Sequence, residues 1–203
     1  MKKYLKLLAL LPLLCGLVIV VSCNKDDDTI GNGFTIIATN VINDIEQIST
    51  VKVIFLEEIE IAQAPYLNNG FELKLPASVS YRYMFPIEYM VHEGDAMMIS
   101  DKNASAFAIT PNNIFGFDQN GNRIGSFVLA SFDRNMFVQW YLVDRDVTVK
   151  GEVGDGEELG YDLDLKKGWN PVYISMDYSR TPVMKFTTEN PYDTELKWFF
   201  VEL

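Results

Sequence analysis

Short segments with a two-residue period recur from residue 34 to residue 203. In residues 71–75 and 161–165, apolar side chains alternate with acidic or basic ones. Such a period places alternate side chains on opposite faces of a β-strand. Turn residues such as Asn, Gly and Pro separate the segments, and no helix cap is followed by a sustained 3.6-residue period. The pattern therefore predicts an all-β fold, either an antiparallel β-sandwich or a partly closed barrel.

The local pattern also predicts how the first strands are covered and connected. Residues 34–39 and 51–56 carry apolar side chains on both faces, which predicts central strands covered on two sides. Between them, residues 43–48 are expected to form one helical turn. Asn69-Gly70 is typical of a tight turn with positive backbone angles.

The strand after this turn has one apolar face and one charged face. In residues 71–75, the aromatic and leucine side chains are expected to face the core, whereas Glu72 and Lys74 face solvent. Pro76 ends the strand because it has no backbone donor.

Two pairs of segments have the pattern of β-hairpins. Residues 113–117 and 124–129 flank a polar, glycine-containing loop. Residues 161–165 precede a turn at residues 166–168, and residues 169–176 are expected to return as the partner strand. Further strands are expected at residues 106–109, 136–143, 146–153, 183–187 and 196–203.

The start of the chain has the parts of a signal peptide. Three lysines among the first six residues precede an apolar run at residues 7–21. The sequence VVSC at residues 20–23 resembles a bacterial lipobox, in which a branched and a small residue precede the modified cysteine. The resemblance implies that residues 1–22 are a cleaved lipoprotein signal peptide, that Cys23 carries a diacylglycerol thioether, and that the new amino terminus is acylated.

Two other interpretations of this start are open. An uncleaved transmembrane anchor needs about 20 apolar residues, but this run is shorter and Pro12 interrupts it. An ordinary secretory signal would leave Cys23 unmodified. Several acyl chains hold a protein on a membrane firmly, whereas a single chain does so only marginally.

Residues 23–33 are interpreted as the lipidated cysteine and a flexible acidic tether. A run of charges cannot pack into a core, and this run resembles the sorting signal of surface-exposed lipoproteins of the Bacteroidetes type. Asp28-Thr29-Ile30 resembles the acceptor triplet for O-glycosylation on Thr29 in that group. The resemblance implies a lipid-anchored protein displayed at the cell outer membrane. The charged run consists of Lys25, Asp26, Asp27 and Asp28.

Charge and cysteine content exclude several classes of function. The chain has 17 basic and 28 acidic residues, and the first 22 residues contain three lysines and no acid. Cleavage therefore leaves 14 basic residues and a net charge of −14, which disfavours nucleic-acid binding and attachment to anionic lipid by charge. Of the two cysteines, Cys15 leaves with the signal peptide and Cys23 carries the lipid. A disulfide or a thiolate metal site is therefore not expected.

The sequence contains few groups that could carry catalysis. His92 is the single histidine, and no nucleophile elbow or zinc-ligand set accompanies it, so a hydrogen-bonded loop residue is the favoured interpretation. Asp118, Asn120 and Asn122 stand at alternate positions, as at the start of a calcium loop. Arg123 occupies the place of the required glycine, however, and the twelfth position lacks its acid. A plain hairpin is therefore predicted, and no cofactor motif is found.

Two further groups of residues have both a structural and a functional interpretation. Glu152, Asp155, Glu157 and Glu158 form an acidic loop, for which a solvated connection between strands is favoured over an ion site. A set of aromatic residues could line a carbohydrate-stacking face, but filling of the core is the stronger expectation. These aromatic residues are Trp140, Tyr141, Trp169, Tyr173, Trp198 and Phe199.

Two segments extend the resemblance to the body of the protein. Residues 61–76 and 162–170 are similar to segments of uncharacterised Bacteroidetes lipoproteins. The first also resembles the late strands of transthyretin-like or carboxypeptidase-regulatory-like sandwiches. The resemblance implies a β-sandwich over residues 34–203, with one sub-boundary near residues 77–100 if the body is divided.

These observations lead to three hypotheses of function. The first is a non-enzymatic module that binds a glycan, a peptide or a partner protein, or that packs into an envelope assembly. The second is a hydrolase of extracellular polymers, for which a concave acidic groove with two carboxyl groups about 5–9 Å apart would be evidence. The third is a ligand-holding barrel, for which an enclosed apolar cavity would be evidence.

Overall fold

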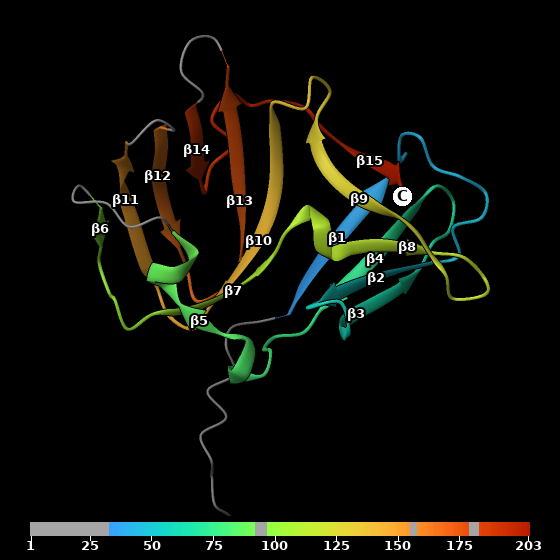
Figure 1. Ribbon diagram of the computed structural model, residues 1–203, viewed down its shortest axis with the longest axis horizontal. Helices are drawn as coiled ribbons and strands as arrows, with labels where there is room; N and C mark the ends of the chain where they lie inside the picture. Colours follow the sequence, from blue (N-terminus) through green and yellow to red (C-terminus); the bar gives the residue numbers. More distant parts are fainter. Residues whose placement is uncertain (1–32, 92–96, 155–157, 179–182) are drawn as a thin grey trace, which may run out of the picture.

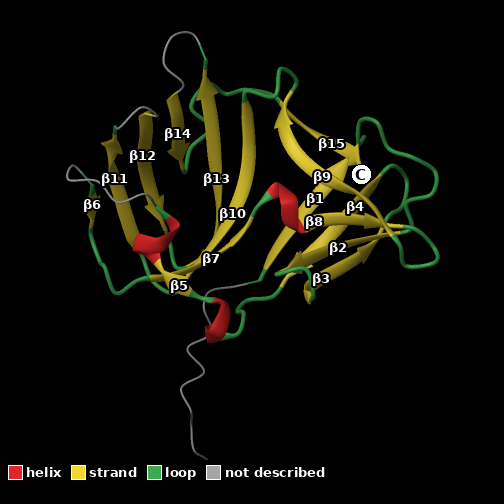
Figure 2. Cartoon of the chain, viewed as in Figure 1, coloured by secondary structure: helices red, strands yellow, loops and turns green. Residues whose placement is uncertain are grey.

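The strands form one large sheet and a second, two-stranded sheet that packs against it (Figures 1 and 2). The computed structural model describes residues 33–91, 97–154, 158–178 and 183–203. The small sheet pairs β1 (Phe34–Thr39) with β4 (Gly70–Leu75) in antiparallel register. The strands of the large sheet are β2 (Thr50–Phe55), β3 (Ile59–Pro65), β5 (Phe85–Pro86), β6 (Met98–Ile99), β7 (Ser105–Ile109), β8 (Ile114–Phe117), β9 (Arg123–Ser131), β10 (Met136–Val143), β11 (Val147–Val153), β12 (Glu158–Leu165), β13 (Gly168–Asp177), β14 (Val183–Thr187) and β15 (Leu196–Glu202).

The large sheet is open among the described residues. Its main path runs in the order β3, β2, β8, β9, β10, β13, β14, β12, β11 and β6, so it has two free ends and does not close into a barrel. β15 pairs with β9, β7 pairs with β10, and β5 pairs with β7. The pairs are antiparallel except for β12 with β14. The prediction of an all-β antiparallel sandwich is therefore confirmed, with the single-turn 3₁₀ helices η1 (Tyr81–Tyr83), η2 (Ile87–Met90) and η3 (Pro111–Asn113) in the connections.

The first core lies between the small sheet and the large sheet. Phe71, Leu73 and Leu75 of β4 point into it and are 5% exposed or less, whereas Glu72 and Lys74 point to solvent, as predicted. At its centre, Trp198 of β15 stacks on Trp140 of β10, with ring centroids 5.8 Å apart. The indole Nε1 of Trp198 donates to the carbonyl of Ile37 in β1 over 3.1 Å. Burial of apolar side chains and the hydrogen bond from the Trp198 indole therefore hold the two layers together.

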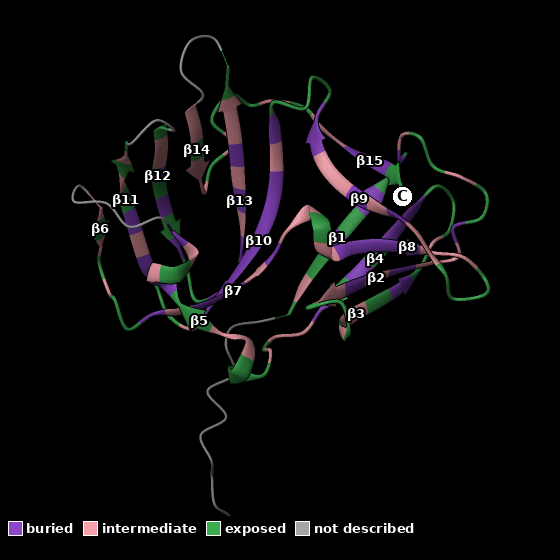
Figure 3. Cartoon of the chain, in the orientation of Figure 1, coloured by how far each residue is buried: buried purple, intermediate pink, exposed green. Residues whose placement is uncertain are grey.

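β10 is buried on both faces and joins two cores. Trp140 and Leu142 belong to the first core, whereas Tyr141 and Val143 belong to a second core with β11 and β12. Figure 3 shows β10 as one of the most continuously buried strands. The connection between β4 and β7 covers the second core, to which η2 contributes the fully buried Ile87.

The predicted hairpin of residues 161–165 with residues 169–176 is wrong. β14 lies between β12 and β13 and pairs with both of them. Asn170 is 8% exposed, and its side chain accepts a hydrogen bond from Lys166 N over 2.8 Å and donates one to Lys166 O over 2.7 Å. These hydrogen bonds close the turn between β12 and β13, while the backbones of the two strands pair with β14 and not with each other.

The prediction that the first two strands are covered on two sides is also wrong. Ile37, on the outer face of β1, is 64% exposed. In β2, Lys52 lies on the face opposite Val51 and Val53, where it pairs with Glu60 over 2.8 Å. Both strands therefore have one core face and one face toward solvent.

Two predictions about turns need correction. The positive φ angles before β4 belong to Asn68 and Asn69, at 52° and 58°, and not to Gly70. Gly70 is required for a different reason, since a Cβ there would lie 2.1 Å from the carbonyl oxygen of Ala38. The expected helical turn at residues 43–48 is a non-helical turn closed by a hydrogen bond from Ile48 N to Ile45 O over 3.1 Å.

We predict that Leu142→Ala lowers the free energy of unfolding by about 2–5 kcal/mol, because the fully buried side chain leaves a cavity in the strand that both cores share. Urea unfolding followed by tryptophan fluorescence and by far-UV circular dichroism measures this loss. Glu72→Ala, on the exposed face of β4, is the control and changes stability by at most about 0.5 kcal/mol. A loss for Leu142→Ala as small as that of the control would contradict the proposed role of β10.

Candidate functional site

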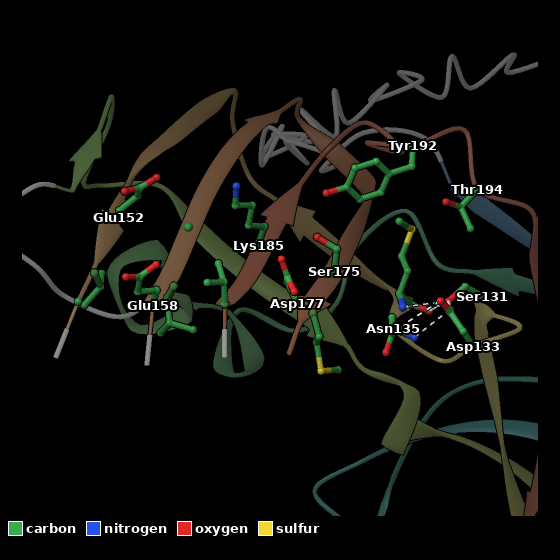
Figure 4. A pocket seen from close by; sticks show the side chains of 17 residues that line it. Ser131, Asp133, Asn135, Glu152, Glu158, Ser175, Asp177, Lys185, Tyr192 and Thr194 are labelled. Atoms are coloured by element: carbon green, nitrogen blue, oxygen red, sulfur yellow. Dashed lines mark hydrogen bonds between the residues drawn. The ribbon is translucent and has the colours of Figure 1, made fainter. Parts of the chain in front are cut away.

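A hollow of about 470 Å³ lies on the polar face of the half of the sheet that contains β11 to β14. We call it the polar groove. Its polar side chains are Ser131, Asp133, Asn135, Glu152, Glu158, Ser175, Asp177, Lys185, Tyr192 and Thr194. Figure 4 shows Glu152 and Glu158 at one end, Ser131, Asp133 and Asn135 at the other, and Ser175, Asp177 and Lys185 between them.

Strand register places the floor of the polar groove. Glu152 of β11 is opposite Gly160 of β12, Gly160 is opposite Lys185 of β14, and Lys185 is opposite Ser175 of β13. The four residues form one row across four strands, all on one face. A Cβ at Gly160 would lie 3.4 Å from Cγ of Lys185. The lysine stem therefore lies over the glycine, and the missing side chain helps to form the hollow.

The neighbouring row on the same face is closed by an ion pair. Lys150 of β11 is opposite Asp162 of β12, and Lys150 Nζ lies 2.9 Å from Asp162 Oδ1. Among the described residues, no carboxylate lies within 4.0 Å of Lys185 Nζ. The lysine in the groove is therefore available to a ligand, unlike the one beside it.

The turn between β9 and β10 forms the other wall, and Asp133 organises it. Asp133 Oδ1 accepts from the Ser131 hydroxyl over 2.6 Å and from Asn135 N over 3.2 Å. The Ser131 hydroxyl oxygen in turn accepts from Met136 N over 3.0 Å. These hydrogen bonds, that from Ser131 above all, hold the pKa of Asp133 below its ordinary value. Asp133 is therefore a fixed anion that shapes the turn and cannot act as a proton donor near neutral pH.

The groove combines many hydrogen-bonding groups with an excess of negative charge. Among the described lining residues, four carboxylates, from Asp133, Glu152, Glu158 and Asp177, stand against one ammonium group, that of Lys185. Its hydroxyl and amide groups can donate to and accept from a polyhydroxylated ligand, and its carboxylates can accept from one. An anionic polymer would be repelled.

Several residues that the sequence analysis considered as candidates for binding have structural roles. Asp118 binds within its own loop, accepting from Asn120 N and from Asn122 N, both over 2.8 Å, so the plain hairpin is confirmed. The preference for core filling by the aromatic residues is confirmed for Trp140, Tyr141, Trp198 and Phe199, which are 4–5% exposed, while Trp169 and Tyr173 are partly buried against the first core.

Two of the four acids of the expected acidic loop lie in strands and not in the connection, and both contribute to the groove. Glu152 lies in β11 and Glu158 begins β12, and both line the polar groove. Asp155 and Glu157 lie outside the described residues. Within the described ranges, no group of three or more His, Cys, Asp or Glu side chains has an arrangement that could hold a metal ion.

Several expected sites lie in parts of the chain that the structure does not describe. These are Cys23, Lys25, Asp26, Asp27, Asp28, Thr29 and His92. In the described part, no helix is long and apolar enough to span a membrane.

Most of the polar groove was missed by the sequence analysis. Lys185 could have been assigned to the polar face from the alternation in residues 183–187, with Met184 and Phe186 on the other face. Nothing in the sequence indicates that Ser131, Tyr192 and Lys185 lie around one hollow, because strand pairing over long distances brings them together.

Comparison of the chain with protein-family models, with curated proteins and with solved structures found no match.

We predict that Asp133→Ala lowers the melting temperature at pH 7 by several degrees and that this difference shrinks at low pH. Folding lowers the pKa of Asp133, so its carboxylate stabilises the native state above the ordinary value of 3.8, and this stabilisation is lost as the pH falls through the lower native pKa. Thermal unfolding of the wild type and the variant between pH 7 and pH 2 measures the effect.

Glu189→Ala, an exposed acid outside the groove, is the control for this measurement. It should leave the melting temperature nearly unchanged at each pH. A wild-type advantage over Asp133→Ala that stays constant down to pH 2 would contradict the assigned role.

Proposed function

We propose that this protein is a lipid-anchored cell-envelope protein, displayed at the outer membrane, whose polar groove binds a neutral glycan without chemical conversion. The observation that carries the proposal is the convergence of hydroxyl, amide, carboxylate and ammonium groups in one open hollow of about 470 Å³. Polar groups placed in this way recognise the hydroxyl groups of a sugar, which donate and accept hydrogen bonds.

The position of the groove supports the proposed display. β1, the first described strand, begins at the lower side of the molecule in Figure 1, whereas the groove is built at the upper ends of β10, β12, β13 and β14. A lipid on Cys23 would attach the domain to the membrane through the expected tether that leads into β1. The groove lies at the other side of the domain from this point of attachment, so the anchor would not block it.

The charge of the groove and one exposed aromatic ring narrow the ligand class. Four carboxylates disfavour anionic polysaccharides. Tyr192 is 70% exposed and lines the groove, so its ring is available to stack on the apolar face of a sugar. We infer a neutral oligosaccharide, with Lys185 as the central hydrogen-bond donor.

A glycoside hydrolase is the second candidate, because two carboxylates in the groove lie near each other. Glu152 is opposite Gly160, and Glu158 lies two residues before Gly160 on the same face. The backbones of such diagonal neighbours are about 7–8 Å apart, which allows the two side chains to bring their carboxyl groups to the separation of about 6.5–9.5 Å that inverting glycosidases use. Both side chains are exposed to solvent, however, whereas a glycosidase keeps its acid protonated in a dry environment. Exposure therefore favours binding over hydrolysis.

We predict that the mature chain is retarded in affinity electrophoresis by at least one neutral polysaccharide, such as a glucan, xylan or mannan, and not by polygalacturonate or alginate. Lys185→Ala should weaken binding about tenfold, because it removes a charged hydrogen-bond donor, and Tyr192→Ala several-fold, because it removes the stacking surface. Tyr89→Ala is the matched control, since this tyrosine is 72% exposed and does not line the groove.

If Lys185→Ala and Tyr192→Ala were retarded as strongly as the control Tyr89→Ala, the support for glycan binding in the groove would be lost. A preference of the wild type for the anionic polymers would have the same consequence. Release of reducing ends from a bound polysaccharide, lost in Glu152→Gln or Glu158→Gln, would replace the binding function with the hydrolase.

We predict that cells expressing the full chain incorporate a radiolabelled fatty acid into the protein and that Cys23→Ala abolishes the label. Cys15→Ala is the control and should keep it, because residue 15 lies within the expected signal peptide. Proteolysis of intact cells should then remove the wild-type protein. Equal label in wild type and Cys23→Ala would contradict the anchor, and full protection from the protease would contradict surface display.

A further inference from the structure

A second hollow, of about 490 Å³, lies on the opposite face of the same sheet. β13 and β14 contribute alternate residues to the two sites, with Ser175 and Lys185 in the polar groove and Ile174 and Phe186 in the second hollow. We call this second site the apolar groove. Its apolar lining includes Val128, Phe137, Ile174, Phe186, Phe199 and Val201.

In the described part of the chain, the layer that covers this face of the sheet is incomplete, which leaves the apolar groove open. The second core, which includes Ile87 of η2, covers the face around Tyr141 and Val143. Farther along β10, Phe137 and Gln139 line the hollow, and η3 forms one wall with Pro111. An apolar sheet face normally packs against another layer, so these side chains offer a binding surface for an apolar group.

Two polar groups distinguish the apolar groove from a bare apolar patch. Gln139 is 6% exposed, and its Nε2 donates to the hydroxyl of Tyr141 over 2.9 Å. The amide oxygen of Gln139 has no hydrogen-bond partner among the described residues, and it keeps some contact with solvent. Because Gln139 lines the hollow, we infer that this oxygen faces it.

Arg134 is the second polar group, and its charge is not neutralised. Its guanidinium carbon lies 5.5 Å from the ring centroid of Phe199. In the described part of the chain, no carboxylate lies within 4.0 Å of the guanidinium nitrogens. The adjacent Asp133 points its carboxylate to Ser131 and Asn135 instead.

We propose that the apolar groove binds an apolar carboxylic acid such as a medium-chain fatty acid. The chain lies on the apolar lining, and the carboxylate pairs with Arg134, whose planar donors suit a carboxylate. The volume is typical of a small-molecule site, and its mostly apolar lining with a few polar groups is the usual composition. Charge complementarity selects this ligand, since a cationic amphiphile would be repelled by Arg134 and a neutral alcohol would leave it unpaired.

Isothermal titration calorimetry of the mature chain carrying Cys23→Ala, so that no attached acyl chain competes, tests the proposal. The ligands are decanoate and decyltrimethylammonium, each below its micelle concentration, and 1-decanol below its solubility limit. Saturable binding of one decanoate is expected, with the alcohol at least about tenfold weaker because it lacks the charge-assisted hydrogen bonds, and with no binding of the cation.

Two variants and one control locate the site. Arg134→Gln should weaken decanoate binding at least about tenfold, and Val201→Trp, at a position that is 40% exposed, should abolish it by filling the hollow. Arg82→Gln changes an exposed arginine of η1 and should bind as the wild type does. Unchanged circular dichroism and urea midpoints separate loss of binding from loss of fold.

Three results would overturn the proposal. These are no saturable binding of decanoate, equal binding by Arg134→Gln and the wild type, and equal binding of decanoate and the cationic amphiphile. Sedimentation equilibrium tests the competing occupant, a second copy of the chain. A dimer that Val201→Trp dissociates, together with no decanoate binding, would assign the groove to self-association instead.

Discussion

Burial of β10 on both faces is the constraint on which the rest of the structure depends. Trp140 and Leu142 face the core under the small sheet, while Tyr141 and Val143 face the core under η2. A strand with two apolar faces must be covered twice. The covering elements come from distant parts of the chain, β1 and β4 on one side and the connection between β4 and β7 on the other. The central position of β10 therefore determines where both layers can lie.

The same two-face geometry explains the two candidate sites. Beyond the region where both layers cover the sheet, β13 and β14 present a polar face on one side and an apolar face on the other. β14 is essential to both, because it supplies Lys185 to the polar groove and Phe186 to the apolar groove. β14 takes its place by pairing with β12 on one side and with β13 on the other. One inserted strand thus contributes to the composition of two surfaces.

Electrostatics divides the polar face into structural and available groups. Lys150 is paired with Asp162, and Asp133 is bound within its turn, so neither is free for a ligand. Among the described residues, Lys185 and the exposed acids Glu152 and Glu158 form no ion pair with another side chain, and they face the hollow. This contrast between neighbouring rows of one sheet is the physical basis for assigning binding to the polar groove.

The sequence alone determined the class of the fold and most strand positions. Alternation in residues 71–75 predicted both the strand and the side of each residue, because the two-residue period is a local property of the backbone. The sequence also carries the lipobox-like segment on which the proposed location depends. Only the tertiary structure decided that β14 separates β12 from β13, that Ile37 is exposed, and that Lys185 lies in a row with Glu152 and Ser175. Those outcomes depend on pairing between segments far apart in the chain, and a local pattern cannot specify which strands become neighbours.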